Sequence, residues 1–316
     1  MLQNSKIFSI LPPPKLLLMP YVGLNISENE IAFVELIKKG NQYRLKSFAC
    51  ESFDKKYFEN GEIIDNQGLS IFVGKFVKKH KIYRAKVSVP EEKVYLFTTT
   101  VPSVHEKTVY QNIESKLEEN IPLKASDCIF SFDFVGHLVE QGEDLVSVTV
   151  TQESYIENYM SVLKSAGLEI MSFDSSPHAI VKALCRDDNK IRIVADIKKS
   201  SLGTYVSLGN KLLFSSTVSL NTIDVLRQGN RKEFIKYQID KVVSYWQEQT
   251  FFNTKIESIL LLHEDNKDES MGIANIDSIE AYEASVWSNV INIEKDLPSI
   301  NKEDSYKYAT SIGLSI

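Results

Sequence analysis

The order of secondary-structure elements predicted at the start of the chain occurs a second time after residue 190. Three strands separated by polar turns, as in an antiparallel meander, are predicted over 21–51 and again over 191–218. Each meander is followed by a helix with its apolar residues on one face and then by a short buried strand. These helices and strands are predicted at 69–77, 85–89, 235–246 and 258–262. A chain with this repeat is expected to form two similar α/β lobes.

A further group of predicted elements, over 93–170, separates the two repeats. A strand comes first, followed by a helix whose first turn carries the capping box of Ser103 and Glu106. A hairpin over 128–151, a second helix and a returning strand complete the group. The order strand-helix-strand-strand-helix-strand predicts a small α+β subdomain of the ferredoxin-like kind.

These elements divide the chain into four parts. They are an extended arm at 1–20, a first lobe at 21–92 and 171–190, an inserted subdomain at 93–170 and a second lobe at 191–316. Within the arm, Pro12, Pro13 and Pro14 predict a stiff polyproline II stretch. Two similar lobes, the first with an inserted subdomain, are the plan of the actin and hexokinase superfamily. We therefore predict an α/β, actin/hexokinase-like two-lobed fold with a small α+β insertion.

Composition excludes some classes of function. The formal net charge is −6, whereas nucleic-acid-binding proteins usually carry a basic face. The three cysteines, Cys50, Cys128 and Cys185, are widely spaced and odd in number, which fits a reducing compartment. No apolar run approaches the roughly 20 residues that cross a bilayer. We therefore expect a cytoplasmic protein that reaches a membrane only through partners.

Other motifs predict no catalytic chemistry. The segment 68–75 looks like a P-loop, but Phe76 stands where a hydroxyl is required and the apolar periodicity predicts a helix. The five histidines include no pair at metal-ligand spacing, so no metal site is predicted. His178 near Asp174 suggests a nucleophilic triad, but Ser176 is better explained as the cap of the following helix. We therefore predict no catalytic residue.

Several segments carry a further resemblance. They are Gly23-Leu24-Asn25-Ile26, Phe33-Val34-Glu35-Leu36, Asn60–Asp65, Val101–Leu123, Leu163–Leu168 and Tyr308–Leu314. In this order they resemble the PilM family of type IV pilus assembly proteins, over roughly residues 20–316. The resemblance implies a cytoplasmic actin-fold scaffold at the inner face of the cytoplasmic membrane, within the platform that assembles a type IV pilus.

The resemblance also implies a partner. In the family, the short cytoplasmic N-terminal tail of PilN, a single-span membrane protein, lies in a cleft between the first lobe and the inserted subdomain. Main-chain hydrogen bonds and side-chain pockets can hold such an extended peptide. The run Ile10-Leu11-Pro12-Pro13 has a similar apolar-then-proline character. The arm is therefore a second candidate occupant of the cleft, in its own chain or in a neighbouring copy.

Mg-ATP between the lobes is the cofactor that the resemblance implies. The first phosphate-binding hairpin falls at Asn25 and Ser27, where the family has an aspartate and a glycine. Glu28 adds a negative charge close to where the phosphates would lie. His263 and Glu264 replace the glycines of the adenosine turn and would fill space that the purine needs. The first hairpin and the adenosine turn thus depart from the family pattern.

The second phosphate-binding hairpin also departs from the pattern, because Lys198 stands where glycine is expected. Its candidate nucleotide-binding residues are Asp196, Lys198, Ser200, Ser201 and Gly203. Together these departures predict a weakened nucleotide site in a protein that is not a working enzyme. The alternatives are a nucleotide-switched actin-like ATPase that polymerises or changes shape, and a sugar or acetate kinase. The kinase is disfavoured because such enzymes use the phosphate loops that are altered in this chain.

Overall fold

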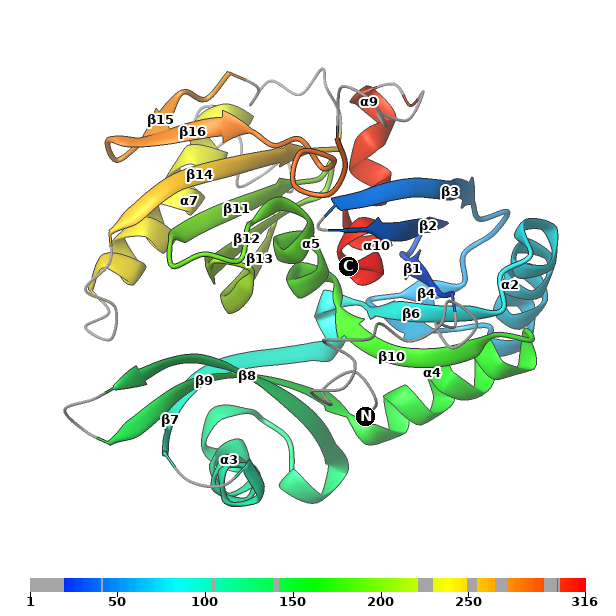
Figure 1. Cartoon of the computed structure of the whole chain (residues 1–316), viewed down its shortest axis with the longest axis horizontal. Helices are drawn as coiled ribbons and strands as arrows, with labels where there is room; N and C mark the ends of the chain where they lie inside the picture. Colours follow the sequence, from blue (N-terminus) through cyan, green and yellow to red (C-terminus); the bar gives the residue numbers. More distant parts are fainter. Residues whose placement is uncertain are drawn as a thin grey trace.

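The computed structural model describes residues 20–40, 42–103, 106–138, 142–220, 230–248, 255–264, 272–292, 300 and 302–316. Apart from Pro20, the arm predicted over 1–20 lies outside these residues. No helix in the described ranges is long and apolar enough to cross a bilayer. Figure 1 shows two lobes side by side, with a smaller unit below them.

The first lobe is built on a five-stranded sheet with the strand order β10-β6-β1-β2-β3. Its strands are β1 (Val22–Ile26), β2 (Glu30–Lys39), β3 (Gln42–Ser52), β6 (Arg84–Val89) and β10 (Glu169–Ser175). The first three form the predicted antiparallel meander, whereas β6 pairs in parallel with both β1 and β10. A separate two-stranded hairpin follows the meander. It consists of β4 (Phe58–Glu59) and β5 (Glu62–Ile63).

The second lobe repeats this topology with the strand order β13-β12-β11-β14-β16-β15. Its strands are β11 (Ile191–Ile197), β12 (Ser201–Leu208), β13 (Lys211–Ser219), β14 (Ile256–His263), β15 (Asn275–Ile276) and β16 (Ile279–Glu283). The strands β11, β12 and β13 form an antiparallel meander, and β14 and β16 continue the sheet in parallel. The order and directions of these five strands match those of the first sheet, which confirms the predicted repeat.

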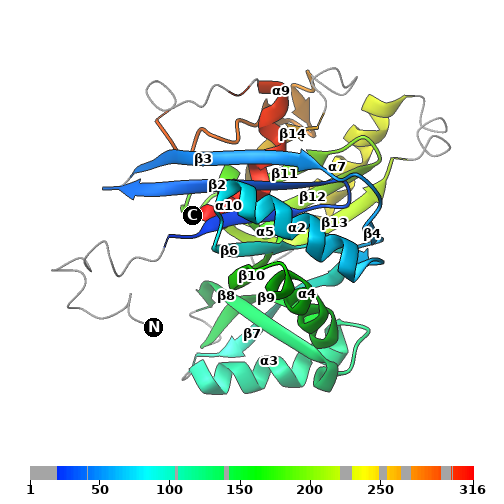
Figure 2. The same cartoon turned by 90° about the vertical axis from the view of Figure 1, so that its right-hand side faces the viewer.

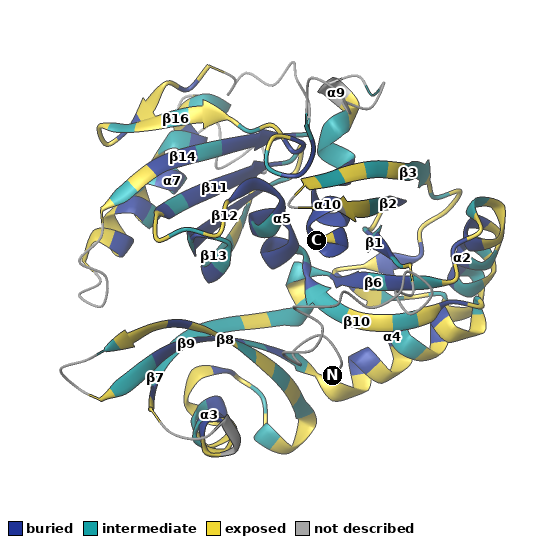
Figure 3. Cartoon of the chain, in the orientation of Figure 1, coloured by how far each residue is buried: buried dark blue, intermediate teal, exposed yellow. Residues whose placement is uncertain are grey.

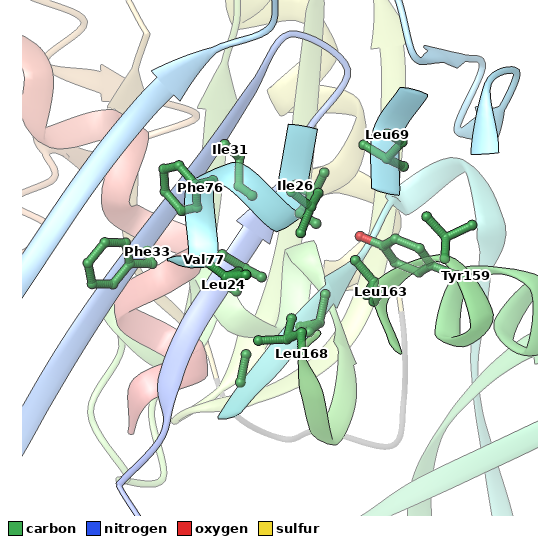
Figure 4. Close-up of a cluster of buried hydrophobic side chains, with 14 of the residues drawn as sticks. Leu24, Ile26, Ile31, Phe33, Leu69, Phe76, Val77, Tyr159, Leu163 and Leu168 are labelled. Atoms are coloured by element: carbon green, nitrogen blue, oxygen red, sulfur yellow. The ribbon is translucent and has the colours of Figure 1, made fainter. Parts of the chain in front are cut away.

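Amphipathic helices cover the outer faces of the two sheets. They are α2 (Asn66–His80) and α4 (Glu153–Ser165) on the first lobe and α7 (Arg231–Gln247) on the second. The segment that looks like a P-loop lies within α2, as predicted, and the Asp65 carboxylate caps this helix by accepting the Gly68 N–H. Figure 4 shows how Phe76 of α2 and Leu163 of α4 enter one core with Leu24 of β1.

The inserted unit is a three-stranded antiparallel sheet, in the order β7-β9-β8, with one helix on one of its faces (Figure 2). Its elements are η2 (Glu91–Lys93), β7 (Val94–Pro102), α3 (Glu106–Asn120), η3 (Ala125–Asp127), β8 (Cys128–Leu138) and β9 (Glu143–Gln152). The other face of the sheet contacts the second lobe, where the Ser147 hydroxyl donates to the carbonyl oxygen of Leu212 on β13 at 2.5 Å.

This unit differs from the ferredoxin-like subdomain predicted over 93–170. Tyr159 and Leu163 of α4 are buried in the core of the first lobe, and β10 pairs with β6 in its sheet. A stripe of apolar residues indicates that a helix is buried but not which core it enters. The insertion therefore ends with β9, and α4 and β10 return the chain to the first lobe.

Two further helices fill the space between the sheets, α5 (Ser176–Leu184) and α10 (Ala309–Ser315), and both are largely buried (Figure 3). Helix α5 packs on β12 and β13 of the second lobe, while α10 packs on β1 and β2 of the first. The Ser315 hydroxyl donates to the carbonyl oxygen of Val34 at 2.6 Å. The last helix of the predicted second lobe, 191–316, therefore packs on the first lobe instead. Two short helical turns, α9 (Lys302–Ser305) and η4 (Tyr306–Tyr308), precede this helix.

Candidate functional site

A cleft of about 360 Å³ lies between the lobes, where β1 and β11 end. It is lined by the turns that follow these two strands, by η2, by Glu264 and by residues at the start of α10. The structure brings six of the seven predicted nucleotide-binding residues together here: Asn25, Ser27, Asp196, Lys198, Ser200 and Ser201. The seventh, Gly203, is buried in β12, where a Cβ atom would lie 2.3 Å from the Tyr205 hydroxyl oxygen.

The side chain of Ser27 closes the turn between β1 and β2. Its Oγ accepts the backbone N–H groups of Glu30, at 3.2 Å, and Asn29, at 3.4 Å. The preceding Asn25 is also engaged, because its Oδ1 accepts the Ser88 hydroxyl at 2.8 Å. Backbone N–H groups of a tight turn are the usual donors to a bound anion. In this turn, two of them are bonded to the chain's own serine.

The turn between β11 and β12 is bonded on both sides. The backbone N–H of Lys199 donates to Glu264 Oε2 at 2.8 Å. On the other side, the Arg231 guanidinium at the start of α7 donates to the carbonyl oxygens of Lys198, at 2.6 Å, and Lys199, at 3.2 Å. One backbone amide of this turn, that of Lys199, therefore already donates to a carboxylate of the protein itself.

Asp196 is fully buried at the base of the cleft and has three partners. The hydroxyl of Tyr306 donates to Oδ1 at 3.0 Å, the hydroxyl of Tyr205 lies 3.3 Å from Oδ2, and Lys198 Nζ lies 3.4 Å from Oδ2. The Asp196 charge raises the pKa of Lys198. A buried carboxylate needs such donors because burial disfavours its charge.

The same network reaches the inserted unit through Glu91 in η2. The Glu91 carboxylate accepts the hydroxyls of Ser215, at 2.6 Å, and Tyr205, at 3.2 Å. Tyr205 thus lies between the carboxylates of Glu91 and Asp196. Burial, together with these two charges, raises the pKa of the Tyr205 hydroxyl well above its usual value.

A second polar cluster lies where the inserted unit meets the first lobe. His178 Nδ1 is 3.0 Å from Asp174 at the end of β10, and His178 Nε2 is 3.6 Å from Asp133 on β8. Lys182 Nζ donates to Asp174 at 2.8 Å. The helix that carries His178 is capped by Ser175, whose Oγ accepts the His178 N–H, rather than by the predicted Ser176.

Asp174 makes the stability of the protein sensitive to acid. Burial alone raises the pKa of its carboxyl, but the charges of His178 and Lys182 outweigh burial and lower the pKa overall. A group with a lowered folded-state pKa stabilises the protein above its unfolded pKa, near 3.9, and this contribution is lost progressively as the pH falls from that value toward the much lower folded-state pKa. Asp174→Asn is expected to cost about 2 kcal/mol at pH 7, and about 1 kcal/mol less at pH 3. Urea unfolding at both pH values measures this, with exposed Asp187→Asn as the control.

Equal destabilisation of the Asp174→Asn variant at pH 7 and pH 3 would contradict this assignment. The free-energy cost of lost packing is independent of pH, whereas the cost of losing a charged, hydrogen-bonded carboxylate depends on pH.

The two repeated lobes, their shared inner helices and the cleft between them define an actin-like α/β protein with a small inserted sheet. The family described as "Type IV pilus assembly protein PilM" matches residues 23–220, which is more than half of the chain. The chain belongs to this family. No curated protein sequence matches it.

One solved structure shares the fold at low sequence identity, and two others are similar at lower TM-scores. A chain of a structure titled "PilM-PilN type IV pilus biogenesis complex" superposes with a TM-score of 0.75 at 17% identity, over 94% of this chain and 98% of that one. The cytoplasmic domain of EpsL, an inner-membrane component of the type II secretion system of Vibrio cholerae, gives 0.49 at 10% identity, over 92% and 94%. The ethanolamine utilization protein EutJ of Carboxydothermus hydrogenoformans gives 0.43 at 12% identity, over 96% and 90%.

Mg-ATP, the cofactor that the resemblance implies, does not fit the donor set of the cleft. The described lining holds six carboxylates against three lysines: Glu28, Glu30, Glu91, Glu92, Asp196 and Glu264 against Lys198, Lys199 and Lys307. A triphosphate would add negative charge to this acidic surface. The amides of Asn29, Glu30 and Lys199 are bonded to side chains of the protein itself. Within the described ranges, no group of three or more potential ligand side chains could hold a metal ion.

Sequence reasoning did not identify Tyr205, Tyr306 or Glu91 as part of this site. Tyr205 did carry a signal, because Gly203 precedes it by two residues in the strand and leaves room for its hydroxyl. Tyr306 carried none, since it is 110 residues from Asp196 and no local pattern links the two.

Proposed function

We propose that this protein is a cytoplasmic scaffold of a type IV pilus assembly platform that binds the cytoplasmic N-terminal tail of a PilN-like membrane protein. Membership of the PilM family carries the proposal, and the fold shared with a chain of the PilM–PilN complex supports it. The proposed location is the inner face of the cytoplasmic membrane. The membrane protein's tail would hold the scaffold there, since no helix of the described chain could span the bilayer.

The free edge of β10 supports a binding mode for an extended tail. This strand is the outer strand of the first-lobe sheet, and β8 is an outer strand of the inserted sheet. In the described part of the chain, no strand pairs with the outer side of either. An extended peptide can add to such an edge through main-chain hydrogen bonds, while pockets for alternate side chains give specificity.

The end of β10 lies close to the middle of β8, where His178 lies between Asp174 of β10 and Asp133 of β8. Each edge also carries a large exposed apolar side chain. Met171 on β10 is 47% exposed and Phe134 on β8 is 46% exposed. These side chains are the proposed contacts for apolar residues of the tail.

The proposal is tested with a fluorescently labelled synthetic peptide that covers the cytoplasmic N-terminal segment of a PilN-like protein. Fluorescence anisotropy is expected to show saturable binding to the wild-type chain. Met171→Glu places a charge on the β10 edge and is expected to weaken binding at least about tenfold, or about 1.4 kcal/mol. Ile71→Glu is the matched control, because Ile71 is 52% exposed on α2, away from this edge.

No binding by the wild-type chain at high micromolar concentration would overturn the proposed function. Binding that Met171→Glu and Ile71→Glu leave equally strong would keep the scaffold function but reject the β10 edge as the site.

A further inference from the structure

We infer that Glu264 is a built-in ligand of the Lys198–Ser201 turn, and that its carboxylate masks a latent oxyanion-binding site. This inference is independent of the proposed tail binding. It concerns only the cleft between the lobes.

The backbone places Glu264 beside this turn. Strand β14 runs parallel to β11 and pairs His263 with Ile197, so Glu264 follows next to the residue that begins the turn. The Glu264 N–H donates to the carbonyl oxygen of Ile197 at 2.9 Å, and its Oε2 accepts the Lys199 N–H at 2.8 Å. One residue therefore bonds the turn through both its backbone and its side chain.

The turn has little freedom to move away from this carboxylate. Lys198 N–H bonds to the Ser201 carbonyl oxygen within the turn, and Arg231 holds the carbonyl oxygens of Lys198 and Lys199 from the opposite side. The Lys199 N–H is thus fixed in the direction of Glu264. A fixed amide that points out of a turn is a donor suited to an oxyanion, and a carboxylate is itself an oxyanion.

Because Glu264 is covalently part of the chain, it is present at a high effective concentration beside the amide. A free phosphate would have to displace it and would also meet its negative charge at close range. The unmodified turn is therefore expected to reject phosphate. Removal of the carboxylate should free the amide and leave the cations Lys198, Lys199 and Arg231 near it.

Glu264→Ala tests the inference with two measurements. Hydrogen exchange of the Lys199 amide, followed by NMR, is expected to be at least tenfold faster in the variant than in the wild type. Inorganic phosphate at 20 mM, compared with chloride at the same ionic strength, is expected to restore protection in the variant and raise its melting midpoint by about 2 °C. The wild type should show neither response.

Two further variants separate the effect of the contact from general destabilisation. Glu264→Gln keeps an acceptor for the amide without the charge, so its Lys199 amide should remain largely protected. Glu157→Ala should behave as the wild type, because Glu157 is an exposed glutamate on α4 that does not line the cleft. Equal protection of Lys199 in the wild type and Glu264→Ala would overturn the inference. A phosphate effect of equal size on the wild type and Glu264→Ala, or no phosphate effect on either protein, would also overturn the inference.

Discussion

Gly313→Ala is expected to destabilise the protein by about 3 kcal/mol or more, although it adds a single methyl group. A Cβ atom at Gly313 would lie 1.7 Å from the carbonyl oxygen of Ala179 and 2.5 Å from its carbonyl carbon. These are backbone atoms of α5, so no side-chain rotation can relieve the overlap. The two inner helices would have to separate, and the buried core that both sheets share would open.

Urea unfolding of the wild type and the variant, followed by circular dichroism, measures this loss. Gly136→Ala is the matched control, because a Cβ atom there meets nothing within 4 Å and its φ is not in the left-handed region. The control is expected to differ from the wild type by less than about 0.5 kcal/mol. Similar stabilities for Gly313→Ala and Gly136→Ala would show that the inner helices are not in close contact at Gly313.

A steep loss of stability above pH 10 is the second large effect expected. Burial raises the pKa of Tyr159, Tyr205 and Tyr306 well above the usual value near 10, and the Asp196 charge adds to this for Tyr205 and Tyr306. A group whose folded-state pKa is raised stabilises the protein fully below its unfolded pKa, and this contribution is lost as the pH rises above it. These three groups alone predict a slope of about 2 kcal/mol per pH unit at pH 10, which rises toward about 4 kcal/mol per pH unit at higher pH.

Unfolding free energies at pH 8, 10 and 10.5 give this slope, and Tyr159→Phe tests the assignment. The Tyr159 hydroxyl is buried and has no hydrogen-bond partner in the described structure, so its removal is expected to be neutral or stabilising at pH 8. The variant should lose the Tyr159 contribution to the alkaline slope, which is about 0.7 kcal/mol per pH unit at pH 10. A slope as steep as that of the wild type would mean that Tyr159 ionises equally in the folded and unfolded chain.

The periodicity of the sequence predicted the two meanders and the repeat, because each strand and helix has one buried face that its own residues define. It did not predict the assignment of α4 and β10, since the apolar stripe of Tyr159 and Leu163 would fit either core. The same reason applies to α10. Ala309–Ser315 is buried throughout, so it has no polar face from which its partner sheet could be deduced.

The position of the cleft could be predicted from the sequence, but the contacts of Glu264 inside it could not. Turns that follow equivalent strands of a repeat lie opposite each other, which is why Asn25 and Asp196 could be placed in one site. Glu264 was expected only to obstruct the cleft. Its bond to the Lys199 amide depends on the parallel pairing of β14 with β11, which a single sequence does not reveal.

The position of α10 constrains how this chain can fold during its synthesis. The first strand begins at Val22, yet the helix that completes the inner face of its sheet spans Ala309–Ser315. Contacts between segments this far apart in sequence form slowly. The strands of the first lobe therefore leave the ribosome long before α10 is synthesised, and the inner face of their sheet stays uncovered until α10 packs on it.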